Sequence, residues 1–251
     1  SGGFGKLTGM NDTARHTVVV TGLGAVTPVA PTVDGLWEAL LAGADGLSDL
    51  DRFDTGGIAC TRAGLTRGYR PPAVKDAEPP ASLAEAFALG AAVQAAAQAG
   101  LTPGDGTAVI AASNFGALDA GEATLATEAA DFRRASLAHG SVTRGVARAL
   151  ALGGPPATLS LSCASGASAL AYAAARIRRG DLDRAVVIGF DALSRCAWSG
   201  LCALRTMTRD TVRPFDRNRS GTVFSEGAAA LVLESAAAAA RRGARPLARL
   251  A

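Results

Sequence analysis

The sequence predicts an α/β fold in which a mixed β-sheet carries helices on both of its faces. Short β-branched runs alternate with longer alanine-rich segments along the chain, as expected where covering helices connect strands. The chain has 251 residues, of which 49% are hydrophobic and 19% charged. This length and composition allow one large globular domain with a substantial core.

The N-terminal part predicts a strand, a short helix and then irregular chain. The β-branched run from Val18 to Thr21 fits a strand, and we expect Gly22 and Gly24 to turn the chain after it. Residues 33–42 fit a helix, because large apolar side chains fall on one stripe: Leu36, Trp37, Leu40 and Leu41. Residues 45–80 are rich in Gly, Pro, Asp and Arg, which predicts a long excursion with little regular structure.

The rest of the chain predicts helices and strands in alternation. Ser82 is a suitable N-cap for a helix over residues 83–99, which we expect to end at Gly100. The further expected elements follow in chain order: a strand over 107–112, a helix over 142–152, a strand over 158–162, a helix beginning after Cys163, and strands over 185–189 and 228–233.

The strongest chemical signal is Cys163, which comes directly after a short strand and directly before a helix. The positive end of a helix favours thiolate over thiol, and thiolate is the reactive form. Ala164, Ser165 and Gly166 are small enough to let a substrate approach. From this pattern alone two interpretations stay open, a nucleophile and a small buried filler.

Four segments in order resemble the β-ketoacyl-[acyl-carrier-protein] synthases, the condensing enzymes of fatty-acid and polyketide synthesis. They are the nucleophile region at 158–170, the first strand and glycine turn at 18–28, the strand at 183–193, and the later loop and strand at 213–221 and 224–234. The resemblance extends from about Thr17 to Glu234. It implies the thiolase fold, two similar α/β halves, of which this chain supplies one.

The resemblance also implies roles for particular residues. Cys163 would accept an acyl group from a pantetheine thioester, and the carbanion from a decarboxylated malonyl-type thioester would then attack it. Phe115 and Leu201 align with positions that line the acyl pocket in relatives, although ordinary core packing explains both equally well. No cofactor or metal is expected, because the substrates are carried on the phosphopantetheine of an acyl carrier protein.

The family's catalytic histidines and lysine are missing from this sequence. Its only histidines are His16 and His139, its only lysines are Lys6 and Lys75, and none stands in a matching motif. A lone histidine such as His139 is more often a surface or satisfied residue than a base. The chain therefore resembles the N-terminal half of a condensing enzyme.

The helix after Cys163 is apolar nearly all round, which is typical of a helix buried on more than one side. We therefore expect a partner besides the acyl carrier protein: a second thiolase-fold chain, either the His-bearing half or a ketosynthase. Two functions stay open. The first is the cysteine-bearing component of a β-ketoacyl synthase, inactive alone; the second is a non-catalytic partner similar to the chain-length factors.

Charge and cysteine usage exclude several other classes. The net charge is only +3, and the densest basic cluster, Arg176, Arg178 and Arg179, closes a helix, so neither nucleic acid nor a membrane is an expected partner. The four cysteines lack zinc-type spacing, and no signal peptide is evident, so we expect a cytoplasmic protein.

Two further expectations concern the domain's extent and a later loop. Residues 1–9, ahead of Met10, resemble a leader added for expression, so the predicted domain spans 10–251. Glu226 and Asp216 are expected to be structural, with a buried carboxylate paired to an arginine of the 213–219 loop.

Overall fold

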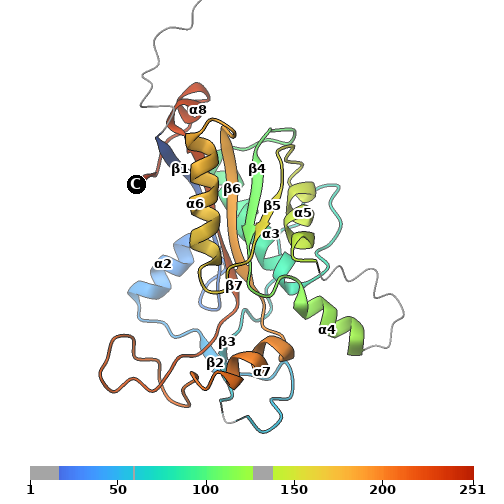
Figure 1. Ribbon diagram of the computed structural model, residues 1–251, viewed down its shortest axis with the longest axis vertical. Coiled ribbons are helices and arrows are strands. Elements are labelled where there is room, and N and C mark those ends of the chain that lie inside the picture. The colour runs from blue at the N-terminus through green and yellow to red at the C-terminus, as the bar shows by residue number, and fades with distance from the viewer. Residues whose placement is uncertain (1–16, 59, 127–137) are drawn as a thin grey trace, which may run out of the picture.

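The computed structural model describes residues 17–58, 60–126 and 138–251, built around a six-stranded mixed sheet (Figure 1). The predicted leader at residues 1–9 lies outside the described residues. The strand order is β5-β4-β6-β7-β1-β8, and a two-stranded hairpin β2-β3 stands apart from it. The strands are β1 Val18–Val26, β2 Leu47–Asp49, β3 Arg62–Gly64, β4 Ala108–Ala112, β5 Ala157–Leu159, β6 Arg184–Asp191, β7 Gly227–Ser235 and β8 Ala248–Leu250.

Helices cover both faces of this sheet, as the sequence predicts. The helices are α2 Val33–Leu41, α3 Leu83–Ala99, α4 Leu118–Ala126, α5 Gly140–Ala149, α6 Ser165–Arg178, α7 Arg195–Ala203 and α8 Ala236–Arg241. The core divides accordingly: α3 and α5 pack into one hydrophobic cluster, and α6 packs into the other. Strand β4 serves both, because Val109 and Ala111 face the first cluster while Ala108, Ile110 and Ala112 face the second.

Strand β1 corrects one sequence expectation. Gly22 and Gly24 do not turn the chain; they lie inside β1, which continues to Val26 in antiparallel register with β7. A Cβ at Gly22 would lie 2.1 Å from the carbonyl oxygen of Ala95, and one at Gly24 would lie 1.9 Å from that of Ala91. These glycines therefore let α3 pack directly against the strand backbone.

Helix α3 confirms its predicted bounds and caps. The Ser82 side chain accepts a hydrogen bond from the Glu85 N–H (2.9 Å), and the Glu85 carboxylate accepts one from the Ala81 N–H (2.9 Å). This arrangement is close to a capping box, except that the carboxylate binds the N–H of the residue before the N-cap. At the other end Gly100 takes the left-handed conformation, with φ of 64°.

Other elements differ from the expectation. The predicted strand over 158–162 ends at Leu159, and the predicted helix over 142–152 begins at Gly140 and ends at Ala149. Helices α4 and α7 were not expected from the sequence, nor were α8 and β8. The described residues between 45 and 80 are irregular apart from the short β2-β3 hairpin.

A buried carboxylate joins the hairpin region to the main sheet, with a different partner from the predicted one. Glu226 pairs with Arg52 rather than with an arginine of the 213–219 loop, and its side chain is fully buried. It also accepts hydrogen bonds from the Thr66 and Leu193 N–H groups, at 2.9 and 3.2 Å. Asp216, by contrast, is exposed and accepts from the Asn218 N–H at 2.6 Å.

Among the residues that the structure describes, no helix is long and apolar enough to cross a membrane.

Candidate functional site

Three loops meet where the parallel strands end. Strands β4, β5 and β6 are parallel, so their carboxyl ends share one edge of the sheet. Residues 113–117, 160–164 and 192–194 leave from that edge. The Ser113 N–H donates to the Leu159 carbonyl at 3.3 Å, which joins the first loop to the end of β5, where the second loop begins. In α/β sheets this edge is where ligands commonly bind.

Cys163 lies in the second loop with its side chain exposed. Ser162 before it has a positive φ of 50°, a conformation that costs a non-glycine residue roughly 1 kcal/mol. The hydroxyl of Ser165 holds this turn closed: it accepts from the Leu161 N–H (2.8 Å) and donates to the Ser162 carbonyl (2.6 Å). The turn therefore presents the thiol outward at the start of α6.

The two ends of α6 differ in the side chains around them. Among the described residues no side chain caps α6, and its first turn contains no acidic residue. The opposite end carries the predicted basic cluster, where Arg176 and Arg179 both pair with Asp181, at 2.8 and 2.7 Å. These arginines fit a solvated helix end.

Phe115 lies in the first loop, on a tight turn that ends at Gly116. Gly116 has φ of 60°, and its N–H donates to the Ser113 hydroxyl at 2.6 Å. The exposed His139 packs beside this turn: its Nε2 lies 3.3 Å from the Asn114 carbonyl oxygen. His139, the residue directly before α5, is thus a surface residue that contacts the Phe115 turn, in agreement with the surface interpretation.

Leu201 lies on α7, half-buried. Two side chains fix the first turn of this helix. The Ser194 hydroxyl accepts from the Ala197 N–H (3.2 Å), and the Glu122 carboxylate of α4 accepts from the N–H groups of Arg195 (2.8 Å) and Cys196. A carboxylate from one helix therefore occupies the positive end of another.

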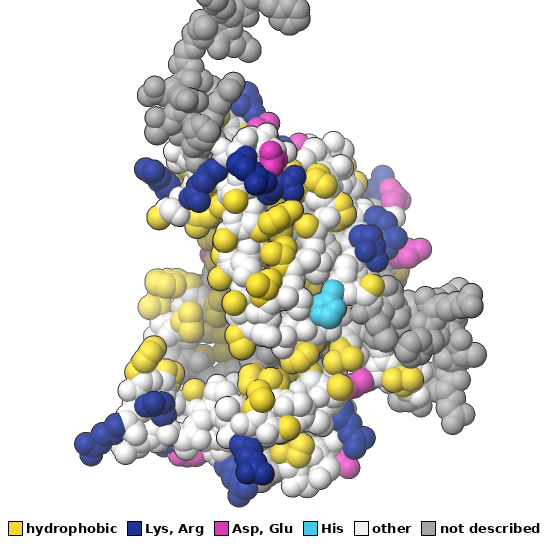
Figure 2. All heavy atoms as spheres, in the orientation of Figure 1, with side chains coloured by type: hydrophobic (Ala, Val, Ile, Leu, Met, Phe, Trp, Pro, Cys, Tyr) yellow, Lys and Arg dark blue, Asp and Glu magenta, His cyan; other side chains and the backbone are white. Residues whose placement is uncertain are grey.

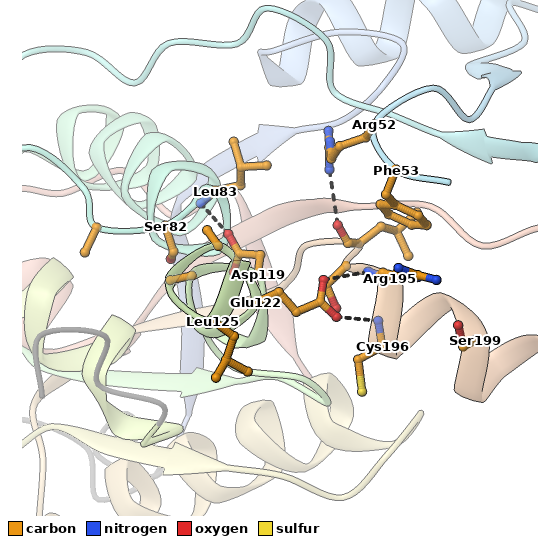
Figure 3. Close-up of a pocket in the computed structure, with 15 residues that line it drawn as sticks. Arg52, Phe53, Ser82, Leu83, Asp119, Glu122, Leu125, Arg195, Cys196 and Ser199 are labelled. Atoms are coloured by element: carbon orange, nitrogen blue, oxygen red, sulfur yellow. Dashed lines mark hydrogen bonds between the residues drawn. The ribbon is translucent and has the colours of Figure 1, made fainter. Parts of the chain in front are cut away.

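A cavity of about 790 Å³ lies between α4 and α7 (Figure 3). Phe53, Leu83 and Leu125 give it apolar walls, and Cys196 and Ser199 lie along its α7 side. Among the described residues its lining includes none of the three predicted site residues, Cys163, Phe115 and Leu201. Sequence reasoning missed this cavity because it predicted neither helix, although Ser194 carried the signal of an N-cap.

Burial perturbs Asp119, which lines this cavity, and Cys202, which lies on α7 outside the lining. Burial raises the pKa of Asp119 against the opposing effect of backbone hydrogen bonds, including one from the Leu83 N–H at 2.6 Å. Burial also raises the pKa of the Cys202 thiol on α7, and nearby Cys60 adds to this. At neutral pH the Cys202 thiol is therefore ionised to a smaller extent than that of an unperturbed cysteine.

The outward face of α6 is apolar and open. Ala164, Ala167, Ala171 and Ala175 are exposed, and Tyr172 is 37% exposed. Figure 2 shows hydrophobic side chains gathered over this helix, with arginines beyond its end. The structure thus confirms the expectation that this half leaves the helix after Cys163 uncovered on one side.

Comparisons with known proteins agree with this architecture. The family model "Beta-ketoacyl synthase, N-terminal domain" matches residues 15–239. The chain is 29% identical over 253 residues to 3-oxoacyl-[acyl-carrier-protein] synthase 2 of Vibrio cholerae, covering 92% of this chain and 61% of that protein. The same enzyme of Staphylococcus aureus is 29% identical over 246 residues, covering 90% and 59%. The chain thus spans about three fifths of the length of these curated relatives.

Solved structures give the same result. A structure titled "The ishigamide ketosynthase/chain length factor" has a TM-score of 0.82 and 32% identity, covering 94% of this chain and 62% of that one. A β-ketoacyl synthase from Burkholderia phymatum has a TM-score of 0.81 and 27% identity, covering 93% and 62%. A type II polyketide synthase acyl-carrier protein in complex with its ketosynthase gives 0.78 and 26%, covering 94% and 62%.

The predicted thiolase-like half-fold is therefore confirmed. Because the family model matches most of its length, the chain belongs to the β-ketoacyl synthase family, of which it supplies the N-terminal domain.

Proposed function

We propose that this chain is the cysteine-bearing part of a β-ketoacyl-[acyl-carrier-protein] synthase, in which Cys163 accepts the growing acyl group. The observation that carries the proposal is the exposed thiol on the turn between β5 and α6, at the carboxyl edge of the parallel strands. Membership of the family supplies the reaction class.

The first step is transfer of an acyl group between two thiols. The Cys163 sulfur attacks the carbonyl carbon of a pantetheine thioester; a new carbon–sulfur bond forms, and the pantetheine thiolate leaves and takes up a proton. The Cys163 N–H is one donor for the negative charge that develops on the carbonyl oxygen. No cofactor takes part in this scheme, because the phosphopantetheine arm of the carrier protein belongs to the substrate.

The condensation step needs groups that this sequence lacks. Decarboxylation of a malonyl-type thioester leaves a carbanion, which attacks the acyl-cysteine and releases the Cys163 thiolate. The two histidines of the chain, His16 and His139, do not stand in the family's catalytic motifs. We therefore infer that histidines from another polypeptide, or from a segment beyond this sequence, complete the site.

Two kinds of partner follow from this proposal. One is the acyl carrier protein, which a structural neighbour contains in complex with its ketosynthase. The other is a second thiolase-fold chain that covers the open face of α6. Trp37, Leu40 and Leu41 on α2 are 63%, 61% and 71% exposed, and they provide further apolar surface for it.

Phe115 and Leu201 are the proposed acyl-pocket residues. Both belong to segments that flank the carboxyl edge: Phe115 follows β4, and Leu201 lies on α7, which follows β6. A phenylalanine ring at residue 115 shortens such a pocket, so we propose that it limits the acyl chain.

A second candidate function is a chain-length factor, a non-catalytic partner that shapes the pocket of a ketosynthase. One observation favours it: a ketosynthase/chain length factor pair is a structural neighbour at 32% identity. The missing histidine motifs fit it as well. The retained, exposed Cys163 argues against it, because such a partner has no use for an acyl-accepting thiol.

One experiment separates the two functions. This chain is combined with a His-bearing ketosynthase half, and ketoacyl product is measured from acyl- and malonyl-carrier protein. The isolated chain should give no product, because each missing acid–base group is worth on the order of 10²–10⁴-fold. Cys163→Ala should abolish turnover of the complex, whereas Cys196→Ala, an equally exposed thiol, should retain it. Unchanged turnover in Cys163→Ala, with altered product length in Phe115→Ala, would make this chain the pocket-shaping partner.

A further inference from the structure

The carboxylate of Asp191 holds the turn that carries Phe115. Asp191 is the last residue of β6, and its Oδ1 accepts three hydrogen bonds: from the Ser113 hydroxyl (2.6 Å), the Asn114 N–H (3.1 Å) and the Phe115 N–H (2.9 Å). Its Oδ2 receives only a longer contact, 3.3 Å from the Asn114 N–H. One oxygen atom therefore fixes two consecutive backbone amides and the side chain before them.

A relay through Ser113 extends this hold to the end of the turn. The Ser113 hydroxyl donates to Asp191 and accepts from the Gly116 N–H at 2.6 Å. Ser113 itself is buried, with 1% exposure. Hydrogen bonds to an ionised acceptor are roughly twice as strong as neutral ones. The backbone on both sides of Phe115 is thus tied, directly or through Ser113, to the end of another strand.

Asp191 also begins the connection to α7. Only three residues, Ala192, Leu193 and Ser194, separate it from the first residue of that helix, and all three are buried. Asp191 therefore binds the turn that carries Phe115 and also begins the connection to the helix that carries Leu201. A shift of the Asp191 carboxylate moves the Phe115 turn relative to α7.

We propose that Asp191 is a positioning residue that sets acyl-chain selectivity by holding Phe115 in place. The inference rests on the proposed function, in which Cys163 accepts an acyl group and Phe115 limits its length. Asp191 does not touch the substrate in this scheme; it acts through the 113–116 turn. Without its carboxylate the ring loses its fixed place and the pocket admits longer chains.

The test compares Asp191→Ala with Asp191→Asn, which keeps an oxygen where Oδ1 stands. Acylation of Cys163 by a butanoyl and by a dodecanoyl pantetheine thioester is followed by intact mass spectrometry on the chain in complex with the His-bearing ketosynthase half. We expect Asp191→Ala to shift the rate ratio toward the dodecanoyl group by roughly tenfold, the scale of a small change in an apolar pocket. Asp191→Asn should stay within about threefold of wild type, because the acceptor is retained.

Two further measurements exclude a general loss of structure. Hydrogen exchange at the Phe115 and Gly116 amides should speed up in Asp191→Ala but not in Asp181→Ala, a control at the far end of α6. In a Phe115→Ala background, Asp191→Ala should no longer change the rate ratio, because Asp191 acts on selectivity only by positioning Phe115.

The outcomes separate this inference from the function on which it rests. If the wild-type chain is not acylated at Cys163 by either thioester, the proposed function fails, and the selectivity role fails with it. If wild type is acylated but Asp191→Ala leaves the ratio unchanged, only the role of Asp191 is refuted. An equal shift in the Phe115→Ala background also refutes it, because Asp191 then acts by another route.

Discussion

At the scale of single residues, the four cysteines differ in what surrounds them. Cys163 and Cys196 are both exposed near the start of a helix, but the Glu122 carboxylate lies at the start of α7 beside Cys196. A carboxylate at that helix start offsets the positive end of the helix dipole. Cys60 and Cys202 are partly buried, and burial raises the pKa of the Cys202 thiol. Cys163 alone combines exposure with an uncapped helix start.

We predict that iodoacetamide at neutral pH alkylates Cys163 faster than the other three cysteines. We expect a difference in labelling rate of roughly fivefold, which corresponds to the about 1 kcal/mol that a free helix N-terminus contributes near a negative charge. Peptide mapping after brief labelling measures the order, and Glu122→Gln provides a matched variant that should speed up Cys196 alone. Equal or slower labelling of Cys163 would contradict the prediction and favour a purely structural cysteine.

The sequence indicated candidate site residues, but it did not indicate which residues hold them in place. Cys163, Phe115 and Leu201 came from local motifs and family resemblance. Their supports are distant in sequence: Asp191 is 76 residues from Phe115, and Glu122 is 73 residues from Arg195. The true partner of Glu226, Arg52, is 174 residues away. Local patterns carry no information on such pairs, so the predicted arginine was wrong although the structural role was right.

At the scale of elements, the long or strongly punctuated segments were predictable. Helix α3 has an N-cap serine, a glutamate three residues later and a terminal glycine within its own sequence, so its bounds were correct. Helix α7 has nine residues and draws part of its N-terminal capping from Glu122 of α4, so its sequence shows less of what stabilises it. The glycines of β1 were misread because the same residue serves turns and close packing.

The packing of α3 on β1 gives a sharp prediction for these glycines. Gly24→Ala should destabilise the protein by at least about 3 kcal/mol, because its Cβ would lie 1.9 Å from the Ala91 carbonyl oxygen and the backbone must move. Gly189→Ala is the matched control, since it also lies in a central strand but its Cβ would meet nothing within 4 Å. Urea unfolding of both variants at equal protein concentration measures the difference. Similar stability of the two would refute direct packing of α3 on the β1 backbone.

At the scale of the whole molecule, one face of a helix and several large apolar side chains are exposed to solvent. The outward face of α6 is a row of exposed alanines, α2 presents Trp37, Leu40 and Leu41, and Phe215 is fully exposed. None of the nine residues of α2, all of them described, is buried. Exposed patches of this extent mark interaction surfaces or lead to aggregation. Each of these segments therefore exposes apolar side chains that are available to a partner.

This surface predicts that the chain forms an oligomer, or aggregates, unless a second thiolase-fold chain covers α6. A stable interface buries about 1,200–2,000 Å² in total, so one charge at its centre should weaken it strongly. Ala171→Glu places that charge on the outward face of α6, whereas Ala240→Glu places it on the exposed side of the short helix α8 and serves as control. Size-exclusion chromatography with light scattering should show assembly for the wild type and the control, and its loss for Ala171→Glu. A wild-type chain that runs as a monomer with a cooperative melt would contradict the prediction, since its apolar α6 face would then need no partner.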